Sequence, residues 1–393
     1  MRHLALALLL LAGLLASPAR AGPRPVLDWL RYDPGLLRAY SLTMDAADSA
    51  RQTLSPIWAG AAAPAHRVLL LVPIKSVDAY SISVNTILSV FRERAIPARF
   101  EVWFYGNDKA VAAESLAWAE ANGIELIMTV GSLATEYVHA KYRGHRIPVV
   151  TSASKDPVPM GQIPGYDVGS GTNIAYTSIN VAIETEITYL RRLIPELREV
   201  AVIYAANNKS AVETQVRPLQ AVAAKHRLTI REVVVRDEQH AVEDISRYVP
   251  AMVSTLRADD PDLRHSVMLV TGSTTVYDQI GLINSFTGRL PVAATLPDVV
   301  RQGDDSAVLS IGVNQSSAVQ IAALYGIDIL LGKVKAGDLK VGLVSTPDIA
   351  ISFRRAREID LLIPFSFFEA ATFIYDYEGR QVRSFGLPVV AQK

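Results

Sequence analysis

Hydroxyl, amide and charged side chains stand directly after several apolar segments of this sequence, at the points where buried strands would end. In chain order they are Lys75, Ser76, Asp78, Ser132, Ser154, Lys155, Asp156, Asn207, Asn208, Ser210, Ser273, Thr274 and Asn314. In open α/β sheets, ligands bind outside the carboxyl ends of the strands. Hydroxyls and amides both donate and accept hydrogen bonds, which suits a polar organic molecule. The pattern therefore predicts a small-molecule binding site.

Several of these residues also have a structural interpretation. Ser132, Ser210 and Thr274 each precede or begin a predicted helix, so they could cap it, and capping does not exclude ligand contact. Asp156 precedes Pro157, a combination that is typical of turns. The lysines of the set could be solvated loop charges. For an aromatic ligand the sequence offers stacking candidates, although core packing explains them equally well: Tyr80, Tyr137, Tyr277 and Trp103.

No catalytic or metal-binding motif accompanies these residues. The sequence has no H-E-x-x-H, no G-x-S-x-G and no Walker loop, and the segment 169–171 lacks the third glycine of a dinucleotide fingerprint. Cysteine is absent, which excludes disulfides, thiolate metal sites and a cysteine nucleophile. We expect a binding protein rather than an enzyme, with no cofactor and no metal.

The N-terminal segment predicts export. Arg2 and His3 precede the apolar run 4–15, and Ala19-Arg20-Ala21 has the form of a cleavage site. The run is shorter than the about 20 residues that a spanning helix needs. We therefore expect a signal peptide cleaved after Ala21 and a periplasmic protein. Without a cysteine, it has no residue for N-terminal lipid attachment.

Composition bounds the remaining possibilities. The chain has 393 residues, half of them hydrophobic, which is enough for two domains with substantial cores. The 39 basic and 39 acidic residues balance. Such a balance provides no general attraction to nucleic acid or to an anionic membrane.

A strand–helix–strand unit occurs twice and would position the polar residues. Apolar segments 67–73 and 99–105 flank a predicted helix at 80–94, and segments 199–204 and 228–235 flank a helix at 210–226. Further strands and helices alternate along the chain, which is typical of a parallel, doubly wound sheet. The predicted fold class is α/β, with two doubly wound parallel-sheet lobes joined by a hinge of several chain crossings.

The expected domain boundaries follow from these elements. Residues 1–21 form the signal peptide, 22–65 an N-terminal extension and linker with a helix near 36–51, 66–173 plus 304–342 the first lobe, 174–303 plus 343–364 the second lobe, and 365–393 a C-terminal tail. The Gly- and Pro-rich segment 161–172 is the expected site of the first crossing between lobes.

From about 67 to 364, the sequence resembles the ABC-transporter substrate-binding protein family that includes tryptophan- and aromatic-amino-acid-binding proteins. The resemblance rests on IPVV at 147–150 before Asp156-Pro157, on GTNI at 171–174, and on LPV at 290–292. It also rests on GIDILLGK at 326–333 and on the segment 349–364. The order and spacing of these motifs carry the resemblance.

The resemblance implies a type I periplasmic-binding-protein fold that closes about a hinge on one small ligand and delivers it to the membrane permease of an ABC importer. The ligand would be polar and organic, such as an amino acid or an aromatic acid. The sequence departs from the family at 74–78, at Ser132-Leu133, at Gly272-Ser273 and at Asn314, and two expected carboxylates are lost. Two alternatives stay open: a periplasmic sensor for a membrane receptor or histidine kinase, and an exported α/β enzyme.

Overall fold

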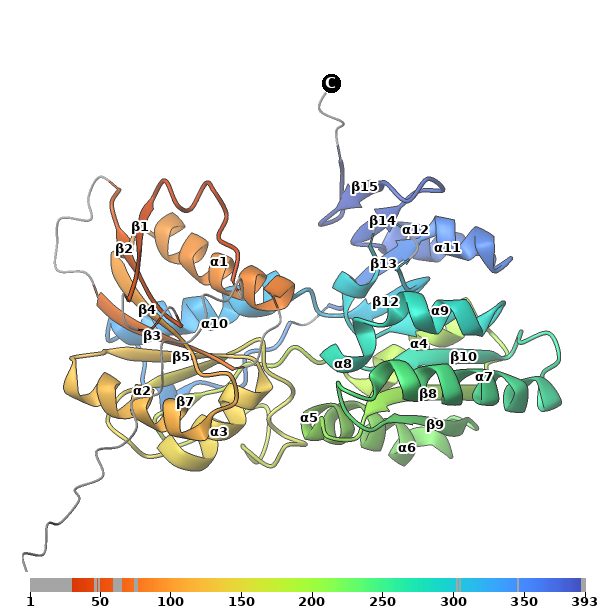
Figure 1. Ribbon diagram of the computed structural model, residues 1–393, viewed down its shortest axis with the longest axis horizontal. Coiled ribbons are helices and arrows are strands. Elements are labelled where there is room, and N and C mark those ends of the chain that lie inside the picture. Colours follow the sequence, from red (N-terminus) through yellow and green to blue (C-terminus); the bar gives the residue numbers. More distant parts are fainter. Residues whose placement is uncertain are drawn as a thin grey trace, which may run out of the picture.

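The protein consists of two α/β lobes that lie side by side (Figure 1). The computed structural model describes residues 30–45, 48, 50–58, 66–73, 77–301, 303, 305–344 and 346–389, so the expected signal peptide lies outside the described residues. The first lobe is built on a seven-stranded sheet and the second on a nine-stranded sheet. Two mostly parallel sheets confirm the predicted fold class.

The sheet of the first lobe has the strand order β1-β2-β4-β3-β5-β6-β7. Its strands are β1 (Tyr40–Met44), β2 (Arg51–Pro56), β3 (His66–Val72), β4 (Ala98–Phe104), β5 (Leu126–Val130), β6 (Val149–Ser152) and β7 (Ile174–Ala175). The strands from β3 to β7 are parallel, whereas β1 and β2 form an antiparallel hairpin on the edge of β4.

This hairpin corrects the helix expected near 36–51. Tyr40 and Leu54 are buried against the lobe, and β2 pairs its backbone with the exposed edge of β4. The polar residues around Tyr40 and Leu54 fit the exposed side of a helix as well as the exposed side of a strand. The backbone hydrogen bonds available at the sheet edge decide the conformation, because strand formation depends on neighbours more than helix formation does.

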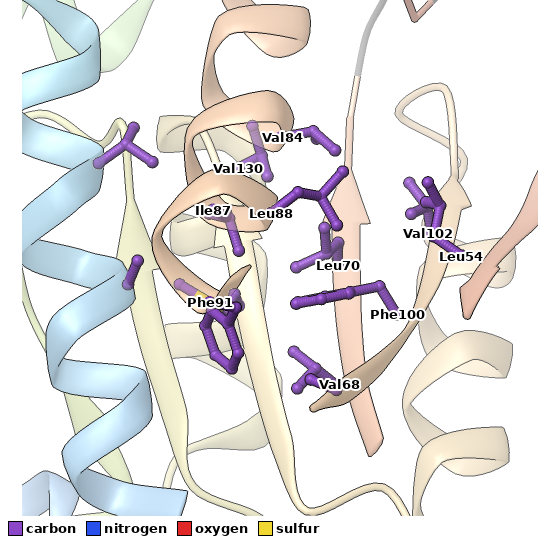
Figure 2. Close-up of a cluster of buried hydrophobic side chains, with 14 of the residues drawn as sticks. Leu54, Val68, Leu70, Val84, Ile87, Leu88, Phe91, Phe100, Val102 and Val130 are labelled. Atoms are coloured by element: carbon purple, nitrogen blue, oxygen red, sulfur yellow. The ribbon is translucent and has the colours of Figure 1, made fainter. Parts of the chain in front are cut away.

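Helices cover both faces of this sheet. On one face, α1 (Val77–Glu93) places Val84, Leu88 and Phe91 against Leu70 and Phe100 of the strands (Figure 2). The helix α10 (Gln315–Leu330) packs beside α1 in the same cluster. On the other face, α2 (Lys109–Ala121) and α3 (Ser132–Tyr142) cover residues such as Leu69 and Leu71. The residues of β3 thus alternate between two buried faces, as a central parallel strand should.

The sheet of the second lobe has the order β16-β15-β14-β13-β12-β11-β10-β8-β9. Its strands are β8 (Glu199–Ala205), β9 (Thr229–Val235), β10 (Ser266–Val270), β11 (Val292–Ala294), β12 (Leu309–Gly312), β13 (Asp348–Ser352), β14 (Phe373–Tyr375), β15 (Gln381–Ser384) and β16 (Leu387–Pro388). Its helices are α4 (Ile183–Leu193), α5 (Lys209–Ala211), α6 (Arg217–Ala223), α7 (Ala241–Asp259), α8 (Thr274–Tyr277), α9 (Ile280–Thr287), α11 (Phe353–Glu358) and α12 (Phe365–Ala370), with a π-turn at Val212–Val216 joining α5 to α6. Short 3₁₀ turns occur at Pro297–Val299 and Ala336–Asp338.

Three element assignments differ from the expected boundaries. Strand β7 pairs with β6 in the first lobe, although 174 was the expected start of the second lobe. Strand β12 pairs with β11 and β13 of the second lobe, although 304–342 was assigned to the first. The segment expected as a tail from 365 forms α12 and three strands that extend the second sheet from β13. In each case backbone pairing with strands distant in sequence, and not the local pattern, decides which sheet the segment joins.

The chain crosses between the lobes three times, after β7, after β12 and before β13. Hydrogen bonds tie the crossings together: Ile179 N donates to Ser154 O at 2.9 Å, and Ser178 N donates to Gly342 O at 2.9 Å. Asn314 N donates to Oδ2 of Asp348 at 2.8 Å. The first crossing thus follows β7 and does not lie at 161–172 as expected. The three crossing segments form a hinge that keeps the strand ends of both sheets close to one another.

Candidate ligand-binding cleft

A cavity of about 280 Å³ lies between the lobes, beside the hinge. The first lobe lines it with Ala79, Tyr80, Asn107, Gly131, Ser132, Leu133, Ala153 and Lys155. The second lobe contributes Asn207, Asn208, Ser210, Glu238, Gly272, Thr274, Thr275, Tyr277 and Leu296, and Ile179 of the hinge and Gln315 at the start of α10 complete the lining. We call this space the cleft cavity. Its volume is at the lower end of the range of small-molecule sites, which begins at about 300 Å³.

Strand ends of both sheets supply this lining. Gly131 follows β5, Ala153 follows β6 and Gly272 follows β10. The carboxyl ends of parallel strands meet at one edge of a sheet, so residues distant in sequence come together there. Of the predicted site residues, this cavity unites Ser132, Lys155, Asn207, Asn208, Ser210 and Thr274.

The remaining predicted residues lie elsewhere. Ser154 is a hinge residue, and Asp156 holds a turn, because its carboxylate accepts hydrogen bonds from Val158 N at 3.0 Å and from the Tyr166 hydroxyl at 2.6 Å. Asn314 caps α10 by accepting from the backbone N of Ser316 at 2.9 Å.

Ser273 is buried just outside the cavity lining. Lys75 and Ser76 lie outside the described residues. Asp78 falls within α1, and its side chain lies outside the described part.

The capping interpretation holds for only part of the set. The Oγ of Ser132 accepts a hydrogen bond from the backbone N of Lys155 at 3.0 Å, so it joins two strand-end loops rather than capping α3. Asn208 caps α5 by accepting from Ala211 N at 3.1 Å, and Ser210 donates to the same Oδ1 at 2.9 Å. These bonds place the polar side chains at the cavity wall in fixed orientations.

Lys155 is not the solvated loop charge that the sequence suggested. Its side chain is buried, and its Nζ has no hydrogen-bond partner among the described residues. Burial lowers the pKa of Lys155 to about 8, and the nearby negative charge of Glu186 partly opposes that shift. A buried ammonium without a partner is costly, so residues of this kind mark functional sites more often than structural ones.

Glu186 is the partner that sequence reasoning missed. It lies on α4 of the second lobe, it is buried, and its Oε2 has no hydrogen-bond partner in the described part of the chain. Burial raises the pKa of Glu186 to about 8, against the opposing effect of Lys155. The signal in the sequence was a carboxylate on the apolar stripe of an amphipathic helix, next to Ile187 and Leu190.

Gly272 makes room for the Lys155 ammonium. A Cβ at Gly272 would lie 2.1 Å from Nζ of Lys155, so only a glycine lets this side chain reach the end of β10. The backbone of Gly272 is held in place, because its N donates to Oε1 of Gln215 at 2.8 Å. Gln215 in turn donates to Oγ1 of Thr295 at 2.6 Å.

Aromatic residues form the apolar walls. The ring of Tyr80 lies over Gly131, where a Cβ would come within 3.3 Å of it. Tyr80 of the first lobe and Tyr277 of the second both line the cavity, and burial raises the pKa of Tyr80. The other aromatic candidates lie elsewhere: Trp103 packs at a tilted angle against Trp118 and beneath the guanidinium of Arg51, and Tyr137 donates to Lys109 O.

A second hollow of about 780 Å³ adjoins the cleft cavity. Ala79, Tyr277, Leu296 and Gln315 line both spaces. Arg31, Ile82, Phe373, Tyr375 and Phe385 contribute to its far wall, and Asn314 also lies there. The interlobe cleft is therefore longer than the cavity that holds most of the predicted residues.

No group of His, Asp and Glu side chains in the described ranges has an arrangement that could hold a metal ion. No described helix combines the length and the apolar character that a membrane crossing requires.

Comparison with known proteins agrees with this architecture. The model of a family described as ABC transporter substrate binding protein matches residues 103–373, which confirms the resemblance noted in the sequence. No curated protein matches this chain.

Solved structures with the same fold have low sequence identity. A conserved domain protein from Vibrio cholerae superposes with a TM-score of 0.64 and 16% identity, covering 79% of this chain and 100% of its own. An ABC domain in complex with L-Trp from Streptococcus pneumonia superposes with a TM-score of 0.63 and 18% identity. The match covers 78% of this chain and 99% of that structure. A ligand-free, open substrate-binding protein with adhesive properties from Clostridium difficile superposes with a TM-score of 0.59 and 17% identity. The match covers 76% of this chain and 96% of that structure.

Proposed function

The chain belongs to the ABC transporter substrate-binding protein family, and from that premise we propose that it is a periplasmic solute-binding protein. In this proposal the two lobes close about the hinge on one small polar organic ligand. The closed form then presents both lobe surfaces to the membrane permease of an ABC importer. The protein itself performs no chemistry on the ligand.

One observation carries the proposal: residues of both lobes line the same cavity beside the three chain crossings. A ligand in that cavity contacts both lobes at once, so its binding energy favours the closed arrangement over the open one. Burial raises the pKa of Glu136 on α3, and the positive charge of Lys209 in the second lobe partly opposes that shift, so these two charges attract each other across the two lobes.

The cavity size and lining support a ligand of about the size of an amino acid or an aromatic acid. One protein of the same fold is described with L-Trp bound. Micromolar affinity corresponds to about −8 kcal/mol. A few hydrogen bonds at about 1 kcal/mol each and the apolar burial against Tyr80 and Tyr277 are sufficient for that.

A calorimetric screen of amino acids, aromatic acids, sugars and nucleosides tests ligand binding. Closure is tested in the same protein, because it contains no cysteine and accepts spin labels at chosen sites. Labels at Lys141→Cys in the first lobe and Lys225→Cys in the second should move closer when a ligand from the screen is added. Both positions are exposed.

The matched control carries both labels in the first lobe, at Lys141→Cys and Lys333→Cys. That distance should stay the same with and without ligand. A screen in which nothing binds, or a ligand that is chemically converted, would contradict a solute-binding function.

A further inference from the structure

Lys155 lines the cleft cavity and carries a buried ammonium, and the chemistry of that group points to a particular ligand group. The residue lines the cavity and is only 7% exposed, and Nζ lacks a hydrogen-bond partner among the described residues. An ammonium in such a place needs an acceptor to offset its lost hydration. An anionic ligand group at the cavity wall would supply that acceptor.

A second positive element lies on the same side of the cavity. Helix α3 has 11 residues, and its N-cap is Gly131, which offers no side-chain acceptor to the first backbone N–H groups. Gly131, Ser132 and Leu133 all line the cavity. The N-terminus of a helix favours an anion through these N–H groups and the helix dipole.

Negative charge, by contrast, is sparse at the cavity wall. Glu238 is the only acidic residue in the described lining, and it is exposed to solvent. Glu186 interacts with Lys155 but does not line the cavity, and burial favours its neutral form. Glu136 lies on α3 within reach of the charge of Lys209 and is also outside the lining. The wall thus provides a partner for a carboxylate and no buried partner for an ammonium.

We propose that the ligand is a small organic acid without an amino group, whose carboxylate is bound between Lys155 and the N-terminus of α3. Its apolar part lies against Tyr80 and Tyr277, on the two walls of the cavity. This assignment rests on the proposed solute-binding function and narrows it, because an α-amino acid would bring an ammonium that the wall does not match.

Matched ligand triplets test the assignment in calorimetry at pH 7. Each triplet keeps one side chain and changes the polar end: 3-(indol-3-yl)propionate, L-tryptophan and tryptamine; 3-phenylpropionate, L-phenylalanine and phenethylamine; 4-methylvalerate, L-leucine and isoamylamine. We expect the acid to bind at least tenfold more tightly than the amino acid in the best triplet, and the amine not to bind.

The protein variant Lys155→Met should weaken binding of that acid at least tenfold. Lys333→Met serves as the matched control. Lys333 is exposed, follows the C-terminal end of α10 and pairs with Asp328 of that helix. The methyl ester of the same acid removes the charge while the protein stays unchanged. It should lose at least tenfold in affinity even if Lys155→Met does not fold.

The outcomes separate this inference from the proposed function. If an amino acid, an amine or a neutral ligand binds the wild-type protein more tightly than every acid, the cleft binds solutes but the carboxylate assignment is wrong. If the acid binds and Lys155→Met binds it equally well, Lys155 does not recognise the carboxylate. If no compound of the triplets or of the wider screen binds, both the function and the assignment fail.

Discussion

Lys155 of the first lobe and Glu186 of the second are buried close enough that each alters the pKa of the other. They are 7% and 3% exposed, and neither Nζ of Lys155 nor Oε2 of Glu186 has a hydrogen-bond partner in the described part of the chain. A buried pair of this kind stabilises a protein little, because the cost of desolvation offsets the attraction between the charges. Because the pair joins the two lobes next to the cleft cavity, we propose a role for it in binding and closure.

The variant Glu186→Gln should be more stable than the wild-type protein, and increasingly so as the pH rises. The pKa of Glu186 is raised to about 8 in the folded state, so between about 4.5 and 8 the unfolded chain loses a proton that the folded chain keeps. Stability falls with pH in that window, by at most about 1.4 kcal/mol per unit. Urea denaturation at pH 5, 6, 7 and 8 measures the difference.

The control for this experiment is Glu184→Gln on the same helix. Glu184 pairs with Lys225 and His226 at the surface, and these contacts lower its pKa. The variant Glu184→Gln should not show a gain in stability over the wild-type protein that grows between pH 5 and 8. Equal pH profiles for Glu186→Gln and the wild-type protein would show that Glu186 ionises as readily in the folded state as in the unfolded chain.

Affinity for an organic acid should be constant at neutral pH and decline above about pH 8. Lys155 loses its proton as the pH rises through its lowered pKa of about 8, and Glu186 gains a negative charge over the same range. Both changes disfavour a carboxylate, and each can lower the affinity by up to tenfold per pH unit. Tyr80 does not titrate there, because burial raises its pKa.

Calorimetry of 3-(indol-3-yl)propionate from pH 6 to 9.5 measures this decline. Above pH 8, binding should also take up a proton, which appears as a difference in heat between two buffers of unlike ionisation enthalpy. In Lys155→Met only the ionisation of Glu186 remains, so the affinity should decline less steeply over this range than in the wild-type protein. An unchanged wild-type affinity at pH 9.5 would show that the charge of Lys155 does not contribute to binding.

The sequence predicted the elements whose own pattern determines their structure. The units β3–α1–β4 and β8 to β9 were identified from continuous apolar segments followed by polar residues, and β3 and β8 are the buried central strands this pattern indicates. The same logic located Ser132, Asn208 and Thr274 at the cavity wall. Local periodicity is sufficient there, because a strand with two buried faces needs a continuous apolar run.

The features that sequence reasoning missed depend on contacts between distant segments. Strands β2 and β14 form because β4 and β13 have free edges for them to pair with. The burial of Lys155 depends on the missing side chain of Gly272, which only the folded structure brings near it. No local pattern distinguishes a lysine of this kind from a solvated one.

The variant Gly272→Ala should reduce ligand affinity while preserving the fold. The new Cβ would lie 2.1 Å from Nζ and 3.2 Å from Cε of Lys155, so it would displace the ammonium from its buried position beside the cavity. Lys155 is flexible, so the cost to folding should be small. We expect a loss of at least tenfold in affinity for an organic acid and a free energy of unfolding within about 1 kcal/mol of wild type.

Gly165→Ala is the matched control for this variant, because its Cβ would meet only Val168 at an ordinary distance of 3.9 Å. Calorimetry and urea denaturation of both variants separate binding from stability. Wild-type affinity in Gly272→Ala would show that the position of the Lys155 ammonium against β10 is unimportant for the ligand.

The variant Gly312→Ala should have the opposite profile, with a large loss of stability. Gly312 ends β12 just before the second crossing, and a Cβ there would lie 2.2 Å from the backbone oxygen of Thr295 and 2.9 Å from Cδ of Pro297. Backbone atoms of a packed sheet cannot move aside as the end of a lysine can. Overpacking of this kind costs about 1–3 kcal/mol, and we expect the upper part of that range.

Urea denaturation followed by circular dichroism measures this loss against Gly165→Ala, which should remain within about 0.5 kcal/mol of wild type. Because Gly312 adjoins the hinge, the label distance between Lys141→Cys and Lys225→Cys should also differ from wild type before ligand is added. If Gly312→Ala is as stable as Gly165→Ala and the lobes keep the same separation, the strand end at β12 is free to shift. The hinge would then be less tightly constrained than its contact with Thr295 implies.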